Sequence, residues 1–374
     1  MDANVVRFIE EAMAAPPLFI VGSGSSMGAG IPGMGALAEY LARNVSTNGF
    51  DACERGQWCE IAERLGKEPV GLESALQEAG ERLGRRVVME IVEKTWCCIA
   101  GGEQELLLKL ACGGDPAGFV RLLKRYAGST SKVVHVMTTN YDHLIEWSAA
   151  SAGWPVWDGF HEGPIGVPLS SAELGERMRR TWRLGKKWVS ETARHVRLYK
   201  PHGSLGWFRF PDGRIKKLTG VGLHHLPQIR KAGLVPAIVI PGAGKYLETH
   251  FEPYSAVFDE MRRALRQAEA LLFVGFGFND DHIAGSLTPV LRSGDVPKIV
   301  LAKQFTPSFE RMMAARQIRN FVAIRQQGSA SMVASDTFSP LLVDIPGLWT
   351  LRGMMNQVWG EEDHDEWTRL VSSE

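Results

Sequence analysis

Three segments of the chain place polar side chains and glycines where they could bind a phosphate-bearing ligand. Gly22–Pro32 is rich in Gly and Ser, and the backbone N–H groups of such a turn can surround a phosphate. Asn140 and Asp142 directly follow an apolar run, and His202 follows another. Because Gly203 follows it, His202 is expected to project from a loop at the end of its run.

Each segment also has a simpler explanation. A Gly/Ser-rich turn is an ordinary strand–helix connection, Asp142 is placed to cap a helix, and a lone histidine is more often structural. The first segment is not a P-loop, since no Gly-Lys-Ser/Thr follows, and Met27 breaks the GxGxxG spacing. A fourth segment, Gly275–Ile283, repeats the glycine turn with Asp280, which could cap a helix or meet ribose hydroxyls.

The apolar runs predict a doubly wound, Rossmann-like α/β fold. Several short runs are almost continuously hydrophobic, as strands buried on both faces of a parallel sheet should be. Longer stretches with helical spacing separate them. The predicted strands are 17–22, 132–140, 197–203, 237–242, 270–278, 298–303 and 321–326. The predicted helices are 34–44, 58–66, 72–100, 104–126, 251–269 and 306–317.

Uneven strand spacing predicts two insertions in this fold. We expect a helical insertion at about 45–128 and a second, smaller one at about 151–196. Residues 1–330 would then form one domain, and 331–374 a C-terminal extension.

Composition excludes several classes of protein. The 374 residues carry 42 Lys/Arg and 42 Asp/Glu, with 45% hydrophobic and 22% charged residues, which is ordinary for a globular chain. No apolar run reaches the roughly 18 residues of a membrane span, and the acidic N-terminus is unlike a signal peptide. Five cysteines without a CxxC pair predict free thiols in the cytoplasm and no metal site.

Charge is nevertheless segregated along the chain. Residues 151–235 hold 15 Lys/Arg against 6 Asp/Glu, whereas 361–374 hold six acids and one Arg. Each charged segment can form a solvent-exposed face of the protein, or a surface that docks on a partner.

The order of the four segments resembles the sirtuin family. Residues 22–34 resemble the sirtuin nucleotide loop, and Thr138–Asp142 the strand end that carries its Asn and Asp. Pro201–Ser204 resembles the segment with the catalytic His, and 275–283 the late glycine loop of bacterial sirtuin-like proteins. The insertions and the last fifty residues lie outside the resemblance.

This resemblance implies an NAD site. Asn140 would hold the nicotinamide ribose and the attacking water, Asp142 would meet the carboxamide, and His202 would act as general base. Backbone near Gly22 would hold the pyrophosphate, and Asp280 would line the adenosine side. The residues implied to contact the dinucleotide are Gly22, Ser23, Gly24, Ser25, Ile31, Pro32, Thr139, Gly275, Gly277 and Asp280.

Two departures from the sirtuin deacylases change the expected activity. The paired CxxC motifs of their zinc ribbon are absent, and Gly33-Met34-Gly35 replaces the Asp-Phe-Arg that shields the ribose from water. The pattern resembles sirtuin-like NAD glycohydrolases of antiviral defence, which act with a HerA-type hexameric ATPase. A protein deacylase, an ADP-ribosyltransferase and a non-catalytic NAD or ADP-ribose sensor are the alternatives. We expect a homo-oligomer, with nucleic acid the less favoured partner and no membrane contact.

Overall fold

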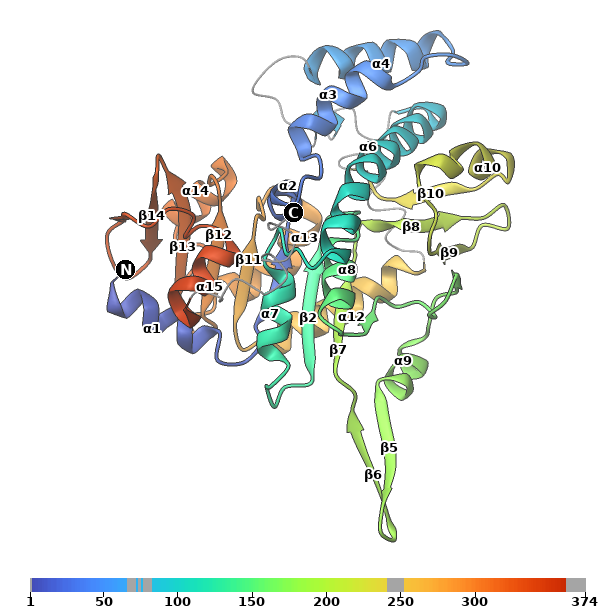
Figure 1. Ribbon diagram of the computed structural model, residues 1–374. Helices are drawn as coiled ribbons and strands as arrows, with labels where there is room; N and C mark the ends of the chain where they lie inside the picture. Colours follow the sequence, from blue (N-terminus) through green and yellow to red (C-terminus); the bar gives the residue numbers. More distant parts are fainter. Residues whose placement is uncertain (1, 66–71, 73–74, 77–82, 241–251, 361–374) are drawn as a thin grey trace, which may run out of the picture.

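A nine-stranded sheet forms the centre of the computed structural model, which describes residues 2–65, 72, 75–76, 83–240 and 252–360 (Figure 1). The strand order is β15-β14-β13-β12-β11-β1-β2-β7-β3. The strands from β13 to β3 pair in parallel, and β14 and β15 add an antiparallel edge. The bounds are β1 (Leu18–Val21), β2 (Val133–Thr138), β3 (Val156–Trp157), β7 (His195–Tyr199), β11 (Leu271–Val274), β12 (Lys298–Ala302), β13 (Phe321–Gln327), β14 (Ala330–Ser335) and β15 (Leu341–Val343).

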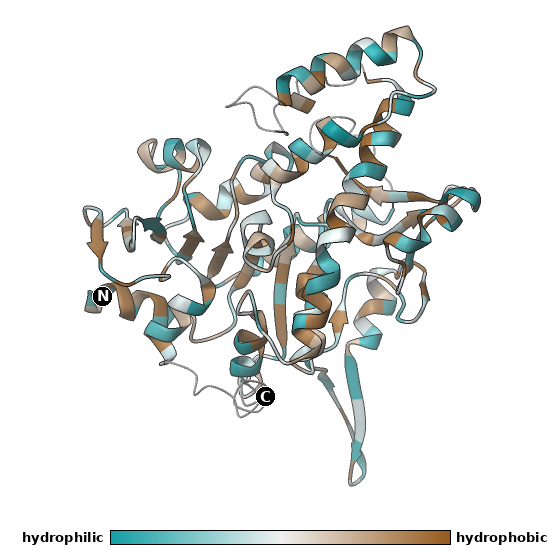
Figure 2. Cartoon of the chain, turned by 45° about the horizontal axis from the view of Figure 1, so that its top comes forward, coloured by the Kyte–Doolittle hydropathy of each residue, from teal (hydrophilic) through white to brown (hydrophobic). Residues whose placement is uncertain are grey.

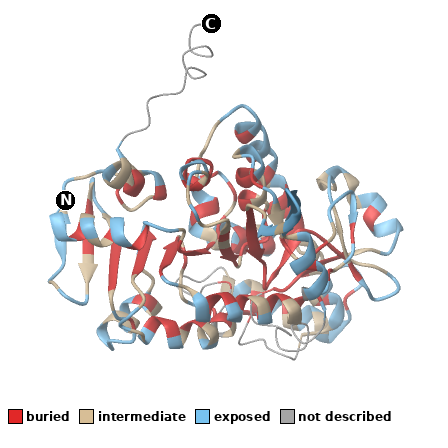
Figure 3. Cartoon of the chain, turned by 90° about the horizontal axis from the view of Figure 1, so that it is seen from below, coloured by how far each residue is buried: buried red, intermediate tan, exposed pale blue. Residues whose placement is uncertain are grey.

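Helices cover both faces of this sheet. In β1, Phe19 and Val21 belong to one apolar cluster, whereas Leu18 and Ile20 belong to the other. Both clusters are buried, which confirms the doubly wound α/β fold predicted from the hydrophobic runs (Figures 2 and 3). On the first face lie α1 (Ala3–Ala12), α3 (Met34–Asn44), α6 (Arg85–Ala111), α7 (Phe119–Tyr126), α8 (Leu144–Ser151) and α15 (Leu351–Trp359); on the second lie α12 (Tyr254–Gln267), α13 (Asp281–Arg292) and α14 (Pro307–Ala314).

The helical insertion contains α4 (Ala52–Leu65), α6 and α7. The helix predicted over 104–126 is wrong, because α6 ends at Ala111 and α7 begins at Phe119. Gly113 and Gly118, both at positive φ, and Pro116 between them interrupt the helical path. Part of the helix predicted over 72–100 lies outside the described residues.

A second, four-stranded sheet lies beside the first. It contains one strand that was predicted to belong to the parallel sheet. It has the order β10-β8-β9-β4, with bounds β10 (Val235–Ile238), β8 (Gly203–Arg209), β9 (Ile215–Leu218) and β4 (Ile165–Gly166). The apolar run at 237–242 was expected in the parallel sheet, but β10 pairs antiparallel with β8 instead. A run buried on both faces occurs in either kind of sheet, so hydrophobicity could not distinguish them.

The second insertion also carries a projecting arm. Strands β5 (Arg179–Leu184) and β6 (Lys187–Thr192) form a two-stranded hairpin that extends away from the rest of the molecule (Figure 1). The remaining helices are α2 (Ser23–Gly28), α9 (Ser171–Arg177), the 3-10 turn η2 (Leu223–His225) and α10 (Leu226–Lys231). None of the described helices is long and apolar enough to cross a bilayer.

Candidate active site

The predicted site residues gather at one edge of the large sheet. Strands β11, β1, β2 and β7 are consecutive neighbours and parallel, so their carboxyl ends meet at this edge. A cavity of about 130 Å³, here called the Asn140 cavity, lies there. Its wall includes Gly22, Ser23, Ser26, Pro32, Thr139, Asn140, Asp142, His202, Gly277 and Asp280.

A buried chain of hydrogen bonds fixes the side chains of Asn140 and Asp142. The Asn140 amide donates to the Gly22 carbonyl over 2.9 Å and to the Ser26 hydroxyl over 2.8 Å. Ser26 in turn donates to Asp142 Oδ2 over 2.7 Å. Sequence reasoning gave no role to Ser26; its position in the Gly/Ser turn, three residues from Ser23, was the available signal.

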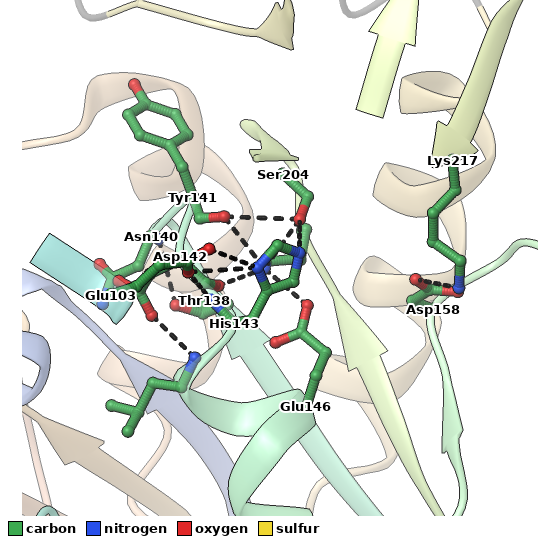
Figure 4. A network of polar contacts seen from close by, with 12 residues as sticks. Glu103, Thr138, Asn140, Tyr141, Asp142, His143, Glu146, Asp158, Ser204 and Lys217 are labelled. Atoms are coloured by element: carbon green, nitrogen blue, oxygen red, sulfur yellow. Dashed lines mark hydrogen bonds and ion pairs between the residues drawn. The ribbon is translucent and has the colours of Figure 1, made fainter. Parts of the chain in front are cut away.

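Asp142 contacts the start of α8 and also lines the Asn140 cavity (Figure 4). Its Oδ1 accepts from the Leu144 N–H at the start of α8, which is a helix-capping contact, while the residue also lines the cavity. Burial raises the pKa of this carboxyl, although the nearby Lys200 ammonium acts in the opposite direction. Lys200 is itself fully buried and donates to the Asp142 carbonyl over 2.5 Å.

His202 faces an acid from a different loop. Its Nε2 lies 2.8 Å from Asp280 Oδ2, an ion-pair distance, although the ring is turned so that its N–H does not point straight at the oxygen. The other oxygen of Asp280 caps α13 through the His282 N–H. The sequence assigned Asp280 to the adenosine side, whereas the structure places its carboxylate beside the imidazole.

The residues around this site lie in a segment that matches a known protein family. The SIR2-like domain model matches residues 134–321, half of the chain. The chain belongs to the SIR2-like domain family. No curated protein matches it.

Several solved Sir2 structures are similar to the SIR2-like chain. A crystal structure of a Sir2 homologue with NAD is 16% identical, covers 86% of this chain and 88% of that one, and has a TM-score of 0.42. A mutant Sir2 homologue with 2′-O-acetyl ADP-ribose is 15% identical over 87% and 91%, with a TM-score of 0.43. A structure on the mechanism and regulation of Sir2 enzymes is 15% identical over 86% and 91%, with a TM-score of 0.38.

The two glycine turns of this chain, near Gly22 and Gly275, contact each other. A Cβ on Gly22 would lie 2.4 Å from the Gly275 carbonyl oxygen, and one on Gly275 would lie 2.4 Å from the Ser25 nitrogen. The N–H groups of Gly22, Gly24 and Ser25 donate to the carbonyls of Val274, Gly275 and Gly22. Since these amides already have partners inside the protein, other donors are needed for a phosphate.

A second cavity on the other side of α2 supplies such donors. This Lys303 cavity has a volume of about 670 Å³ and contacts Gly24, Ser25 and Gly275. Lys109, Lys303 and Arg352 line it, against Asp115 as the one described acid. Sequence reasoning missed these three cations, because no motif marks them.

The remaining predicted residues are placed as follows. Ile31 is buried in the core next to Pro32, which lines the Asn140 cavity with Gly33 and Met34. All five cysteines are free. Among the described residues, no group of three or more His, Cys, Asp and Glu side chains could hold a metal.

Proposed function

We propose that the chain is an NAD glycohydrolase, which cleaves NAD to nicotinamide and ADP-ribose. The observation that carries the proposal is the Asn140 cavity, where Asn140, Asp142 and His202 converge within a SIR2-like domain. The solved relatives with bound NAD and 2′-O-acetyl ADP-ribose support NAD as the substrate.

The two cavities divide the dinucleotide between them. The Asn140 cavity, at about 130 Å³, is smaller than the roughly 300–1,000 Å³ of whole-ligand pockets, so it suits only the nicotinamide end. The Lys303 cavity is large enough for the ADP portion, and Lys303 and Arg352 can help to neutralise the pyrophosphate, whereas Lys109 is already ion-paired with Glu105. Helix α2 contributes residues to both cavities, so a single ligand would pass across it.

The chemistry follows from which bond breaks. The ribose–nicotinamide bond breaks with its electron pair retained by the pyridine nitrogen, and a water oxygen bonds to the ribose carbon. Asn140, already fixed by Gly22 and Ser26, would orient this water and the ribose. His202 would accept the proton that the water loses.

Two features favour hydrolysis over transfer to a protein. Met34 occupies the position of the phenylalanine that shields the ribose in sirtuin deacylases, and the zinc-ribbon cysteines of those enzymes are absent from the sequence. Deacylation and ADP-ribosyl transfer are the alternative activities, and both begin by cleaving the same ribose–nicotinamide bond. The second alternative, a non-catalytic sensor, would bind NAD or ADP-ribose without cleaving this bond.

Product analysis tests the proposal. Incubation with NAD should release nicotinamide and ADP-ribose without an acyl-lysine peptide, and Asn140→Ala and His202→Ala should each slow release by about 10²–10⁴-fold. Asn44→Ala, at an exposed helix end, is the matched control and should retain the wild-type rate. Nicotinamide release that requires an acyl-lysine peptide would identify a deacylase, and binding without turnover a sensor.

We further propose that this activity serves antiphage defence by depleting cellular NAD in the cytoplasm, with a HerA-type ATPase as partner. The support is the resemblance of the motifs, together with the need to restrain an enzyme that consumes NAD. Cells carrying the active chain should lose NAD after phage infection, whereas cells carrying His202→Ala should not.

A further inference from the structure

One wall of the Lys303 cavity is built by the C-terminal segment 349–352. All four residues of this segment line the cavity, although the SIR2-like match ends at residue 321. The loop 114–117, which joins α6 to α7 in the helical insertion, lines it too. Both stretches lie outside the resemblance that implied an NAD site, so no motif explains why they lie beside the glycine turns.

Packing holds the C-terminal segment at the cavity. Strands β14 and β15 extend the central sheet beyond the family match, and α15 follows with Leu351 and Met355 buried. The Arg352 guanidinium donates to the carbonyl of Asp115 in the loop 114–117. The segment is therefore anchored to the sheet and to the helical insertion, which preorganises its side chains for a ligand.

Trp349 gives this cavity an aromatic surface. It is half-buried, and it is the one aromatic residue among the described residues of the wall. Met27, Pro116 and Leu301 add apolar surface around it. Every nucleobase has a π-face that can stack on an indole ring, so this part of the wall suits the adenine of a dinucleotide.

The charged part of the wall suits the phosphates. Arg352 and Lys303 are exposed, and neither forms an ion pair with another described residue. The carboxylate oxygens of Asp115 accept from the backbone N–H groups of Val120 and Arg121 at the start of α7. A guanidinium has five N–H donors, so Arg352 can keep its contact with the Asp115 carbonyl and still bind a phosphate oxygen.

The position of the cavity along the sheet edge agrees with this division. Gly22 follows β1 and Lys303 follows β12, with β11 between them, whereas Asn140 follows β2 on the other side of β1. Neighbouring strands lie about 4.8 Å apart, so the end of β12 lies roughly 10 Å from that of β1, in the direction away from Asn140. Adenine is the part of NAD farthest from the nicotinamide and would lie in this direction.

We propose that Trp349 and Arg352 are substrate-binding residues, with the adenine of the dinucleotide stacked on Trp349 and its pyrophosphate paired with Arg352. This inference rests on the proposed function for the identity of the ligand, and it adds the contacts that hold the ADP portion. The C-terminal segment 349–352 is then part of the substrate site.

Calorimetric titration of the full chain with ADP-ribose tests these contacts, because this ligand carries the adenine and the pyrophosphate but has no nicotinamide bond to cleave. Trp349→Leu and Arg352→Gln should each weaken binding by about tenfold or more. Trp349→Phe keeps an aromatic ring and should retain most of the affinity. Arg266→Gln, at an exposed position of α12 beside a different cavity, is the matched control and should bind as the wild type does.

A second ligand tests the stacking on the wild-type chain itself. UDP-ribose keeps the pyrophosphate and both riboses but replaces adenine with a smaller pyrimidine, so it should bind several-fold more weakly than ADP-ribose. Trp349→Leu should abolish most of this difference, because neither base would then have an indole to stack on.

The outcomes separate this inference from the proposed function. Undiminished ADP-ribose binding by Trp349→Leu and Arg352→Gln, or no ADP-ribose binding by the wild type, would overturn the inference. NAD cleavage by both variants with an unchanged KM would do the same and leave the glycohydrolase proposal intact. If ADP-ribose binding depends on both residues but the wild type does not cleave NAD, the inference stands and the glycohydrolase proposal fails.

Discussion

One substitution can decide whether Asp280 acts at the nicotinamide end or at the adenosine end of bound NAD. Asp280→Asn keeps the α13 cap, because Asn caps helices as well as Asp does, but removes the charge 2.8 Å from His202. If the carboxylate orients the imidazole, kcat should fall by about tenfold or more with little change in KM. A raised KM with unchanged kcat would instead support the adenosine-side role. Steady-state kinetics with NAD distinguishes the two.

The contact between the two glycine turns makes a prediction about stability. Gly275 has a φ of +60° and no space for a Cβ, so Gly275→Ala should lower the free energy of unfolding by about 2 kcal/mol or more. Gly285 lies inside α13 with open space around it, and Gly285→Ala should raise stability by about 0.5–1 kcal/mol. Chemical denaturation measures both variants. Equal effects at the two positions would contradict the proposed packing.

Strand β2 contains a histidine that should make the fold sensitive to acid. Burial lowers the pKa of His135 from 6.5 to about 4, and the Arg197 and His195 charges add to this. Between these two values the unfolded chain binds the extra proton, so stability should fall as the pH drops through this window. His135→Gln keeps an acceptor for the Tyr199 hydroxyl, which lies 2.9 Å from the His135 ring nitrogen.

Denaturation as a function of pH tests the histidine. Between pH 6.5 and 4, the free energy of unfolding of His135→Gln should fall by about 2 kcal/mol less than that of the wild type. The comparison at pH 8, where the imidazole is neutral in both states, is the control. Parallel stability curves for the two proteins would show that His135 does not contribute.

The sequence predicted local features of these elements better than it predicted their partners. Continuous apolar runs identified β1, β2 and β11, and the polar residues after them identified Asn140 and Asp142, because both signals are local. The pairing of Asp280 with His202 joins loops far apart in the chain, and no spacing rule reports it. For the same reason, β10 was expected in the wrong sheet.

At the scale of the whole molecule, five of the 15 Lys/Arg residues of segment 151–235 lie in one projecting arm. The β5–β6 hairpin carries Arg179, Arg180, Arg183, Lys186 and Lys187 against Glu191. Trp182, Leu184 and Trp188 on the same hairpin are 39%, 68% and 72% exposed. A two-stranded hairpin is marginally stable alone, and exposed tryptophans are enriched at interfaces, so the arm is suited to a contact with another molecule.

We expect this arm to support the predicted homo-oligomer, through its apolar side chains and its charge opposite to the acidic segment 361–374, which lies outside the described residues. Light scattering at micromolar concentration should give a mass of several chains. A Trp182→Ser and Trp188→Ser double variant should reduce that mass, whereas Met89→Ser, at a 43% exposed position of α6, should not. If nucleic acid is the partner instead, its binding should weaken steeply with salt, while an oligomer with an apolar interface should persist. A monomer at every salt concentration would defeat the prediction, because it would leave the exposed tryptophans without the protein contact that their exposure implies.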